Sequence, residues 1–280
     1  MSAAATAGTL SRPRSPIGGN LSALATLASR RLALTARTPR ELVVPLLTPV
    51  LFALVIAPAL KKALHTSASY ESFVAVGTLG LLIPLNTMFS GLSVIVDRES
   101  GAQRELLAAP INRSLLVFGN LVIAIATTAL QIGVLIAFAS QRRIHFHPTV
   151  SGVLWFAAVA LLFAIAMYGV AETLAARVPR AEEYIARVPA IAIVPWFLAG
   201  SLFPITALPL GLTWFARFLP LTHALALMRY GLLGDSSGLH TIWKLSNPTS
   251  MAALSLAVVA VFAALLTRVS VRAFKHAAVR

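Results

Sequence analysis

The sequence lacks cysteine altogether and is poor in charge, and both shortages restrict what the protein can be. Without cysteine, the chain has no disulfide framework, no thiolate zinc site and no cysteine nucleophile. Only 11% of its 280 residues are charged, whereas 58% are hydrophobic and the mean hydropathy is +0.83. Soluble domains carry about 25% charged residues, so this composition excludes an ordinary soluble fold and predicts a protein that has lipid as its solvent.

Acidic residues are especially scarce: nine Asp and Glu stand against 23 Lys and Arg, for a formal net charge of +14. Such an excess can indicate nucleic-acid binding. Here the basic residues are spread thinly between apolar stretches, as in membrane proteins whose loops face an anionic leaflet. We therefore expect membrane lipids as partners and no nucleic acid.

Six apolar stretches contain no Asp, Glu, Lys, Arg or His in their interiors. Most have the roughly 20 residues needed to cross a hydrocarbon core of about 30 Å. Because ionisable groups inside a membrane usually mark an ion path or a reactive centre, their absence disfavours ion-coupled pumps and intramembrane hydrolases. The pattern predicts an all-α integral membrane protein with six transmembrane helices, at residues 42–60, 73–96, 114–139, 150–171, 188–203 and 249–267.

The remaining segments complete one transmembrane domain over residues 20–280. Residues 1–19 mix Ser, Gly, Pro and Arg without apolar period, which predicts a disordered cytoplasmic tail. Residues 20–40 carry leucines at helical spacing and several arginines, the pattern of an N-terminal amphipathic helix at the membrane interface. The proline-rich stretch between the fifth and sixth spans predicts re-entrant or interfacial helices. Sixteen Lys and Arg fall on one set of flanking segments and seven on the other, which predicts that both termini are cytoplasmic.

Sites for nucleotides and metals are also missing from the sequence. None of the four lysines follows a glycine, so the Gly-Lys-Ser/Thr element of a phosphate-binding loop does not occur. We therefore expect no cofactor on this chain, and any ATP and Mg²⁺ that drive it to lie on a partner subunit. His145 and His147 have no third ligand nearby in the sequence, so we expect no metal site.

A charged segment between the second and third predicted spans reads D-R-E-S-G-A-Q-R-E-L-L-A-A-P from residue 97 to residue 110. From composition alone, an ordinary charged loop with a helical turn explains it equally well. The order of the residues, however, closely resembles the loop of ABC-2 type permeases, the membrane subunits of a class of ATP-binding-cassette exporters. In that family the segment is a cytoplasmic coupling helix that docks on the ATPase. The resemblance assigns ATPase coupling to Asp97, Arg98, Glu99, Gly101, Arg104, Glu105, Leu106, Leu107 and Pro110.

A second segment resembles the same family after the fifth predicted span. It reads F-L-A-G-S-L-F-P at 197–204, followed by L-P at 208–209 and P-L-T-H at 220–223. A proline-rich outer loop explains the prolines but not their joint spacing. The positions that match the family motif are Gly200, Phe203, Pro204, Pro209, Pro220, Thr222 and Arg229.

The resemblance covers about residues 21–275 and implies a non-enzymatic permease subunit in a bacterial inner (plasma) membrane. It further implies a separate ABC ATPase subunit, a second permease copy or paralogue, and alternating access. Drug or antibiotic efflux, as in the daunorubicin-resistance branch, is the favoured cargo class. Export of lipid, glycolipid or polysaccharide is the alternative within the family, and a membrane-embedded transferase is the alternative outside it.

Two polar stripes on the predicted spans are candidates for a substrate path. Asn86, Ser90 and Ser93 share one face of the second span, and Asn120, Thr127 and Gln131 form the stripe on the third, with Thr127 and Gln131 as the candidates there. Small and polar residues also hold helices together in membranes. We favour the packing interpretation over substrate contact.

Overall fold

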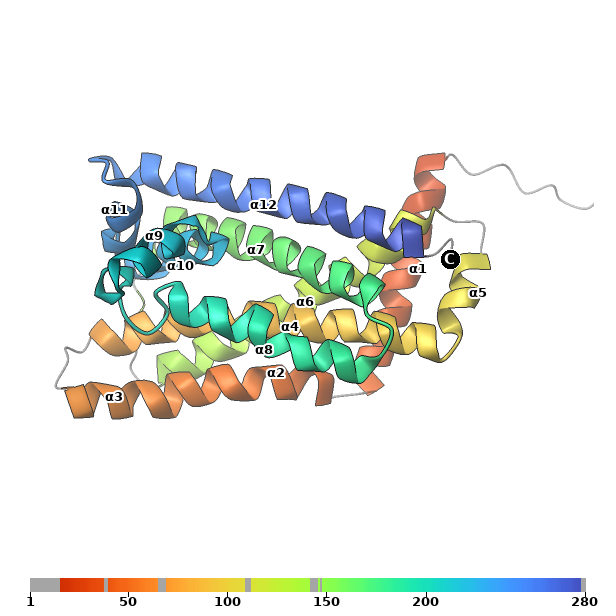
Figure 1. Ribbon diagram of the computed structural model, residues 1–280, viewed down its shortest axis with the longest axis horizontal. Coiled ribbons are helices and arrows are strands. Elements are labelled where there is room, and N and C mark those ends of the chain that lie inside the picture. The colour runs from red at the N-terminus through yellow and green to blue at the C-terminus, as the bar shows by residue number, and fades with distance from the viewer. Residues whose placement is uncertain are drawn as a thin grey trace, which may run out of the picture.

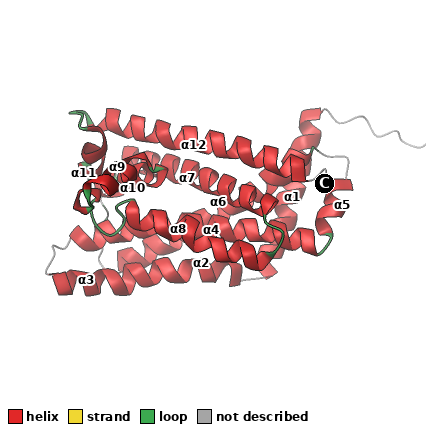
Figure 2. Ribbon diagram, viewed as in Figure 1, coloured by secondary structure: helices red, strands yellow, loops and turns green. Residues whose placement is uncertain are grey.

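The computed structural model describes residues 16–37, 40–64, 69–108, 112–141, 146 and 148–277, and all regular elements within these ranges are helices. The long helices run side by side along one bundle (Figures 1 and 2). They are α4 (Ser69–Glu99), α6 (Arg113–Gln141), α7 (Val150–Arg177), α8 (Ala181–Leu198) and α12 (Pro248–Ala277).

Among the described residues, α4, α6, α7 and α12 are long and apolar enough to cross a membrane. The pair α9 (Leu210–Phe218) and α10 (Pro220–Leu233) makes a fifth candidate if its 79° bend belongs to one broken span. The chain is therefore an all-helical, multi-pass membrane protein with four to five candidate spans.

The first and fifth predicted spans are not single helices that are long and apolar enough to qualify as candidate membrane spans. The first falls on α2 (Arg40–Leu51), a π-helix at Phe52–Ile56 and α3 (Ala57–Leu64). The fifth falls on α8, which begins before the predicted stretch, so that three charged residues lie within the helix. It also ends earlier, at Leu198, because the turn that follows includes Gly200 in the left-handed region at φ +82°.

Helix boundaries elsewhere extend beyond the apolar stretches. The first helix, α1, spans Pro16–Arg37 and so includes four residues of the predicted tail, while residues 1–15 lie outside the described ranges. The helix of the fourth span continues to Arg177 and takes in Glu172, which is fully buried. The predicted boundary at residue 171 left this carboxylate just outside the span.

The helix α4 occupies the centre of the bundle. The apolar stretch of α4 that is long enough to cross a membrane is 72% buried inside the protein. The corresponding stretches of α6, α7 and α12 are only 28–39% buried. Trp196 of α8 is fully buried and donates from Nε1 to the carbonyl oxygen of Gly77 at 2.7 Å. A Cβ at Gly77 would overlap the carbonyl oxygen of Ser201, so the turn after α8 packs directly on the backbone of α4. The central position makes α4 the helix through which neighbouring elements contact one another.

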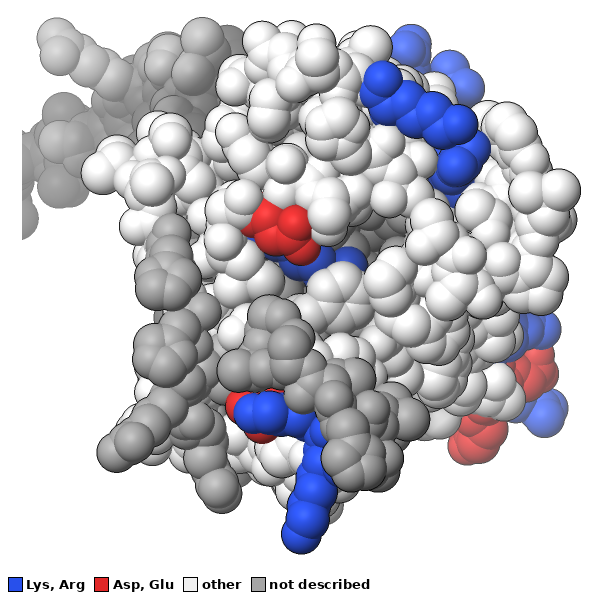
Figure 3. Space-filling view, turned by 90° about the vertical axis from the view of Figure 1, so that its left-hand side faces the viewer, with Lys and Arg blue, Asp and Glu red and all other residues white. Residues whose placement is uncertain are grey.

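The two ends of the bundle differ in charge. The end with α3, α9 and α11 (Ser237–Trp243) is mostly uncharged, with a few separate acidic and basic groups (Figure 3). At the other end, α1 crosses the bundle steeply and α5 (Ala102–Ala108) follows α4, near the C-terminus (Figure 1). The helices and turns here carry a dense set of basic residues: Arg30, Arg31, Arg98, Arg104, Arg177, Arg180, Arg272 and Lys275.

Candidate functional site

The short helix α5 forms the first part of the candidate site. The chain leaves α4 through Gly101, whose φ of +81° and open surroundings suit glycine, and Gly101 O accepts a hydrogen bond from Arg104 N. Leu106 and Leu107 of α5 pack on a cluster formed by Leu116, Val117, Leu121, Ala124, Tyr168 and Phe274. These leucines hold α5 against the bundle and leave Arg104 and Glu105 exposed.

The charged residues before Gly101 contact the protein itself. The Arg98 guanidinium donates to the carbonyl oxygens of Ala175, at 3.0 Å, Val178 and Pro179. These carbonyls lie at the C-terminal end of α7, where backbone acceptors lack helical partners, so Arg98 caps that end. Glu99 accepts weakly from the Ala181 backbone N–H at 3.4 Å, at the start of α8. The predicted coupling residues Arg98 and Glu99 thus connect α4 to α7 and α8, while Pro110 lies outside the described residues.

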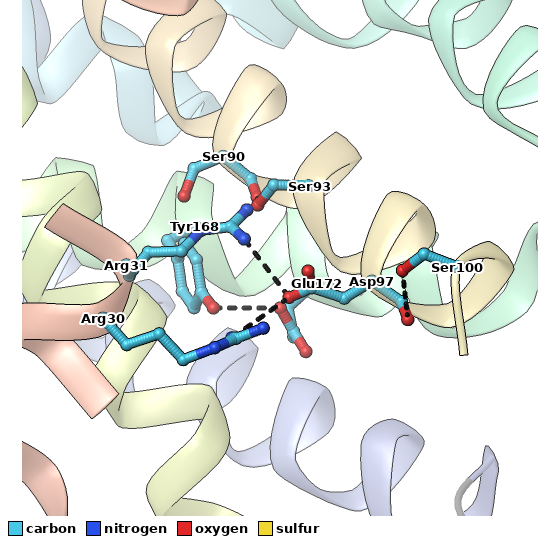
Figure 4. A network of polar contacts seen from close by, with 8 residues as sticks. All are labelled: Arg30, Arg31, Ser90, Ser93, Asp97, Ser100, Tyr168 and Glu172. Atoms are coloured by element: carbon cyan, nitrogen blue, oxygen red, sulfur yellow. Dashed lines mark hydrogen bonds and ion pairs between the residues drawn. The ribbon is translucent and has the colours of Figure 1, made fainter. Parts of the chain in front are cut away.

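Asp97 connects α4 to α1 (Figure 4). Nη1 of Arg31 lies 3.2 Å from Oδ2 of Asp97, and Nη1 of Arg30 lies 4.0 Å from the same oxygen. The side chains of Arg31 and Asp97 are only 9% and 17% exposed. Solvent screens this pair less than it screens a surface ion pair, and the pair joins α1 to the end of α4.

A second carboxylate lies beside this pair, on α7 (Figure 4). Oε2 of Glu172 accepts a hydrogen bond of 2.9 Å from the Tyr168 hydroxyl, which also lies 3.2 Å from the Val117 carbonyl oxygen. Arg31 is close enough to attract Glu172 electrostatically. The other oxygen of Glu172 has no hydrogen-bond partner among the described residues. Arg31 therefore faces two acidic groups, one on α4 and one on α7.

Sequence reasoning missed Arg31, Tyr168 and Glu172 as parts of this site. Tyr168 and Glu172 are four residues apart, and that spacing places their side chains on one helix face. The spacing was thus available as a signal in the sequence. The pairing of Arg31 with Asp97 had no such signal, because 66 positions separate the two residues.

Within the first polar stripe, Asn86 joins α4 to α6. Nδ2 of Asn86 donates to the Ala124 carbonyl oxygen at 3.2 Å and lies 3.1 Å from Oγ1 of Thr127 and 2.5 Å from Oγ1 of Thr128. Ser93 bonds the carbonyl oxygen of Ser90 within α4. Asn86 is 4% exposed and Gln131 is 2% exposed, so neither side chain faces open solvent. Asn86 and Thr127 are thus brought together, in the manner expected of helix packing.

The motif after α8 converges on Arg229, which is buried in α10. Its Nη2 donates to the carbonyl oxygens of Gly200 at 2.8 Å and Ser201 at 3.1 Å, and its guanidinium lies 3.4 Å from the centroid of the Phe73 ring. Thr222 is also buried, whereas Phe203, Pro204 and Pro209 are exposed and Pro220 starts α10. Gly200 and Arg229 therefore form a structural connection between the turn and α10, and the prolines shape the path between them.

No group of three or more His, Asp or Glu side chains able to hold a metal ion occurs within the described ranges. The pair His145 and His147 lies outside those ranges.

The chain is similar to a known protein family and to a named protein. The family described as "ABC-2 type transporter" matches residues 22–233, well over half of the chain. A protein of Porphyra purpurea named "Putative transport permease ycf38" is 26% identical over 187 residues, which is 66% of this chain and 64% of that protein. The match thus spans less than two thirds of the relative's length. The family match extends from the amphipathic helix to the end of α10 and includes both motifs. The chain belongs to the ABC-2 type transporter family.

Proposed function

We propose that the chain is the membrane-spanning permease subunit of an ABC exporter and that a separate ATPase subunit docks on α5. One observation carries this proposal: α5 is held by its own two leucines at the charged end of the bundle, with Arg104 and Glu105 directed outward. A short helix with an apolar inner side and a charged outer side suits a partner protein better than lipid. The ATP and Mg²⁺ belong to that partner.

Six membrane crossings follow from the same proposal. They are the helical run α2–α3, then α4, α6, α7, α8 and α12, with α9 and α10 as a re-entrant pair. The excess of arginine at the end with α5 supports a cytoplasmic location for that end and for both termini. The membrane is the bacterial plasma membrane, and α1 lies along its inner surface.

The contacts around Asp97 and Arg98 give a route for mechanical coupling. A push on α5 passes to α4 through the turn at Gly101, to α1 through the Asp97–Arg31 pair, and to α7 through Arg98. These three helices pass through the bundle or cross its end, so they would move together when the ATPase closes. A second permease copy would provide the opposite wall of the transport path.

Drug or antibiotic efflux is the proposed cargo class. It is supported by the resemblance to the daunorubicin-resistance branch and by the short connections between helices. Export assays with and without the ATPase test the cargo: loss of a drug's efflux only when the ATPase is withheld supports the proposal, and efflux without any ATPase contradicts it.

The docking assignment is tested by charge reversal at an exposed position. Glu105→Arg leaves the leucine contacts of α5 in place, and we expect roughly tenfold weaker binding of a co-expressed ABC ATPase subunit, because the reversed charge would repel a basic group that pairs with Glu105 across the interface. Glu182→Arg is the matched control, since Glu182 is an exposed acid at the same end of the bundle, on α8. Unchanged co-purification and ATPase stimulation in Glu105→Arg would overturn the assignment.

A further inference from the structure

A cavity of about 920 Å³ lies between the ends of α4, α5, α7 and α12. The elements that form it meet at the right-hand end of the protein in Figure 1. Its basic lining groups are Arg98, Arg104, Arg177, Arg272 and His276. No carboxylate occurs among the described residues that line it.

The positive charge of this cavity is not neutralised within the described part of the chain. Arg98 directs its donors to backbone carbonyls, so its full charge remains. Arg104, Arg177 and Arg272 are exposed, and the ion pairs found among the described residues involve other arginines and one lysine. Converging cations beside low-dielectric walls produce a strong positive potential.

Apolar side chains also line the cavity. They are Val94, Leu107, Val269 and Phe274, and Val269 is 41% exposed on α12. Val261 and Leu265 of α12 are also exposed apolar residues, so the exposed surface of this helix is apolar near the cavity. A ligand that combines a phosphate with hydrocarbon matches both the basic and the apolar lining residues, whereas a free inorganic anion matches only the basic ones.

We propose that this cavity binds the phosphate headgroup of an anionic phospholipid from the adjacent leaflet. The arginines bind the phosphate oxygens with charge-assisted hydrogen bonds, and the apolar lining residues contact the glycerol and the first part of an acyl chain. Basic pockets between membrane helices at the cytoplasmic surface are suited to such headgroups. The inference does not rest on the exporter assignment, because it requires only that this end of the bundle lies at a membrane surface.

The test measures lipid binding to the purified full chain without any ATPase, so that its outcome is separate from that of the docking experiment. Native mass spectrometry would compare dioleoyl-phosphatidylglycerol with dioleoyl-phosphatidylcholine. We expect the anionic lipid to bind roughly tenfold more tightly to the wild-type protein, and the double variant Arg177→Gln/Arg272→Gln to lose that preference. A lysine version, Arg177→Lys/Arg272→Lys, keeps the charge and should retain most of the preference.

A matched control removes the same charge nearby. Arg180 and Lys275 are exposed at the same end of the bundle but do not line the cavity, so Arg180→Gln/Lys275→Gln should keep the lipid preference. Equal loss in both glutamine variants would mean that only the general surface charge matters, and would overturn the site. If glycerol phosphate in solution binds as tightly as the phospholipid, the ligand need not be a lipid, and the proposal of a lipid headgroup is overturned. A cavity variant that keeps the preference but no longer binds the ATPase would assign the cavity to the protein interface instead.

Discussion

Arg31 and Asp97 lie 66 positions apart in the sequence, yet their side chains meet at 3.2 Å at the junction of α1 and α4. Both side chains are largely shielded from solvent. Glu172 of α7 lies within the electrostatic reach of the same guanidinium. One arginine of α1 thus lies close to acidic groups on two other helices, α4 and α7.

Asp97→Asn should loosen α1. Hydrogen bonds to charged groups contribute about 1.5–3 kcal/mol, and the amide cannot balance the charges of Arg30 and Arg31. We expect backbone amides of α1 to exchange roughly tenfold to a hundredfold faster in hydrogen–deuterium exchange. Glu183→Gln is the control: it breaks the exposed Arg187–Glu183 pair, which should contribute at most about 1 kcal/mol. Unchanged exchange in α1 of Asp97→Asn would contradict the importance of the pair.

Tyr168→Phe should destabilise the protein because it leaves Glu172 buried without its hydrogen-bond donor. A buried polar group that loses its partner costs about 1–3 kcal/mol. Replacing both partners, as in Tyr168→Phe/Glu172→Leu, should recover most of that free energy of unfolding. Unfolding by SDS in mixed micelles measures the free energies of the two single variants and the double variant, which together form a double-mutant cycle. If the double variant is as unstable as the sum of the two single variants, the residues are not coupled.

Asn86→Leu should weaken the contact between α4 and α6 without changing which substrates are exported. Interhelical hydrogen bonds in membranes contribute about 0.6 kcal/mol on average and at most about 1.7 kcal/mol. We expect a loss of unfolding free energy in that range and the same order of preference in competition between exported compounds. The same competition in Gln131→Leu tests the second stripe. A changed order in either variant would favour direct contact with substrate.

Gly77→Ala should be strongly destabilising, whereas Gly133→Ala should be harmless or stabilising. A Cβ at Gly77 would overlap the carbonyl oxygen of Ser201, and overpacking of this kind costs about 1–3 kcal/mol. Gly133, in α6, has open space at the same position, so alanine should add up to about 1 kcal/mol through helix propensity. The melting temperatures of the two variants are compared in the same detergent. Equal changes in melting temperature would show that the close contact at Gly77 does not affect stability.

The sequence predicted the helical elements well because apolar length and charge placement are local properties. The stretches at 73–96, 114–139, 150–171 and 249–267 all lie within long helices that qualify as membrane spans. The bent pair after α8 likewise occupies the place where prolines predicted broken helices. The first and fifth predicted spans are helical in less regular form, with a π-helix in one and charged residues in the other.

The interior of the candidate site was not predictable in the same way. Whether Glu172 is buried depends on Tyr168 and on the approach of α1, and that approach is a property of the tertiary fold. The three carbonyls that Arg98 contacts lie about 80 positions away, in α7 and the turn after it. Predicting their partnership would require knowing beforehand how the ends of α4 and α7 meet. The family resemblance identified the segment but not the internal contacts of its charges.

The length of α4 has one more consequence. Its 31 residues extend for about 46 Å at roughly 1.5 Å per residue, and still reach about 44 Å along the membrane normal at a tilt of about 20°. The hydrocarbon layer is only about 30 Å thick, so about 14 Å of the helix, or two to three turns divided between its two ends, must lie in the headgroup layers. Asp97 and Arg98 are at the tip of this helix, and α5 follows directly after it. A soluble protein can therefore reach α5 without entering the hydrocarbon core.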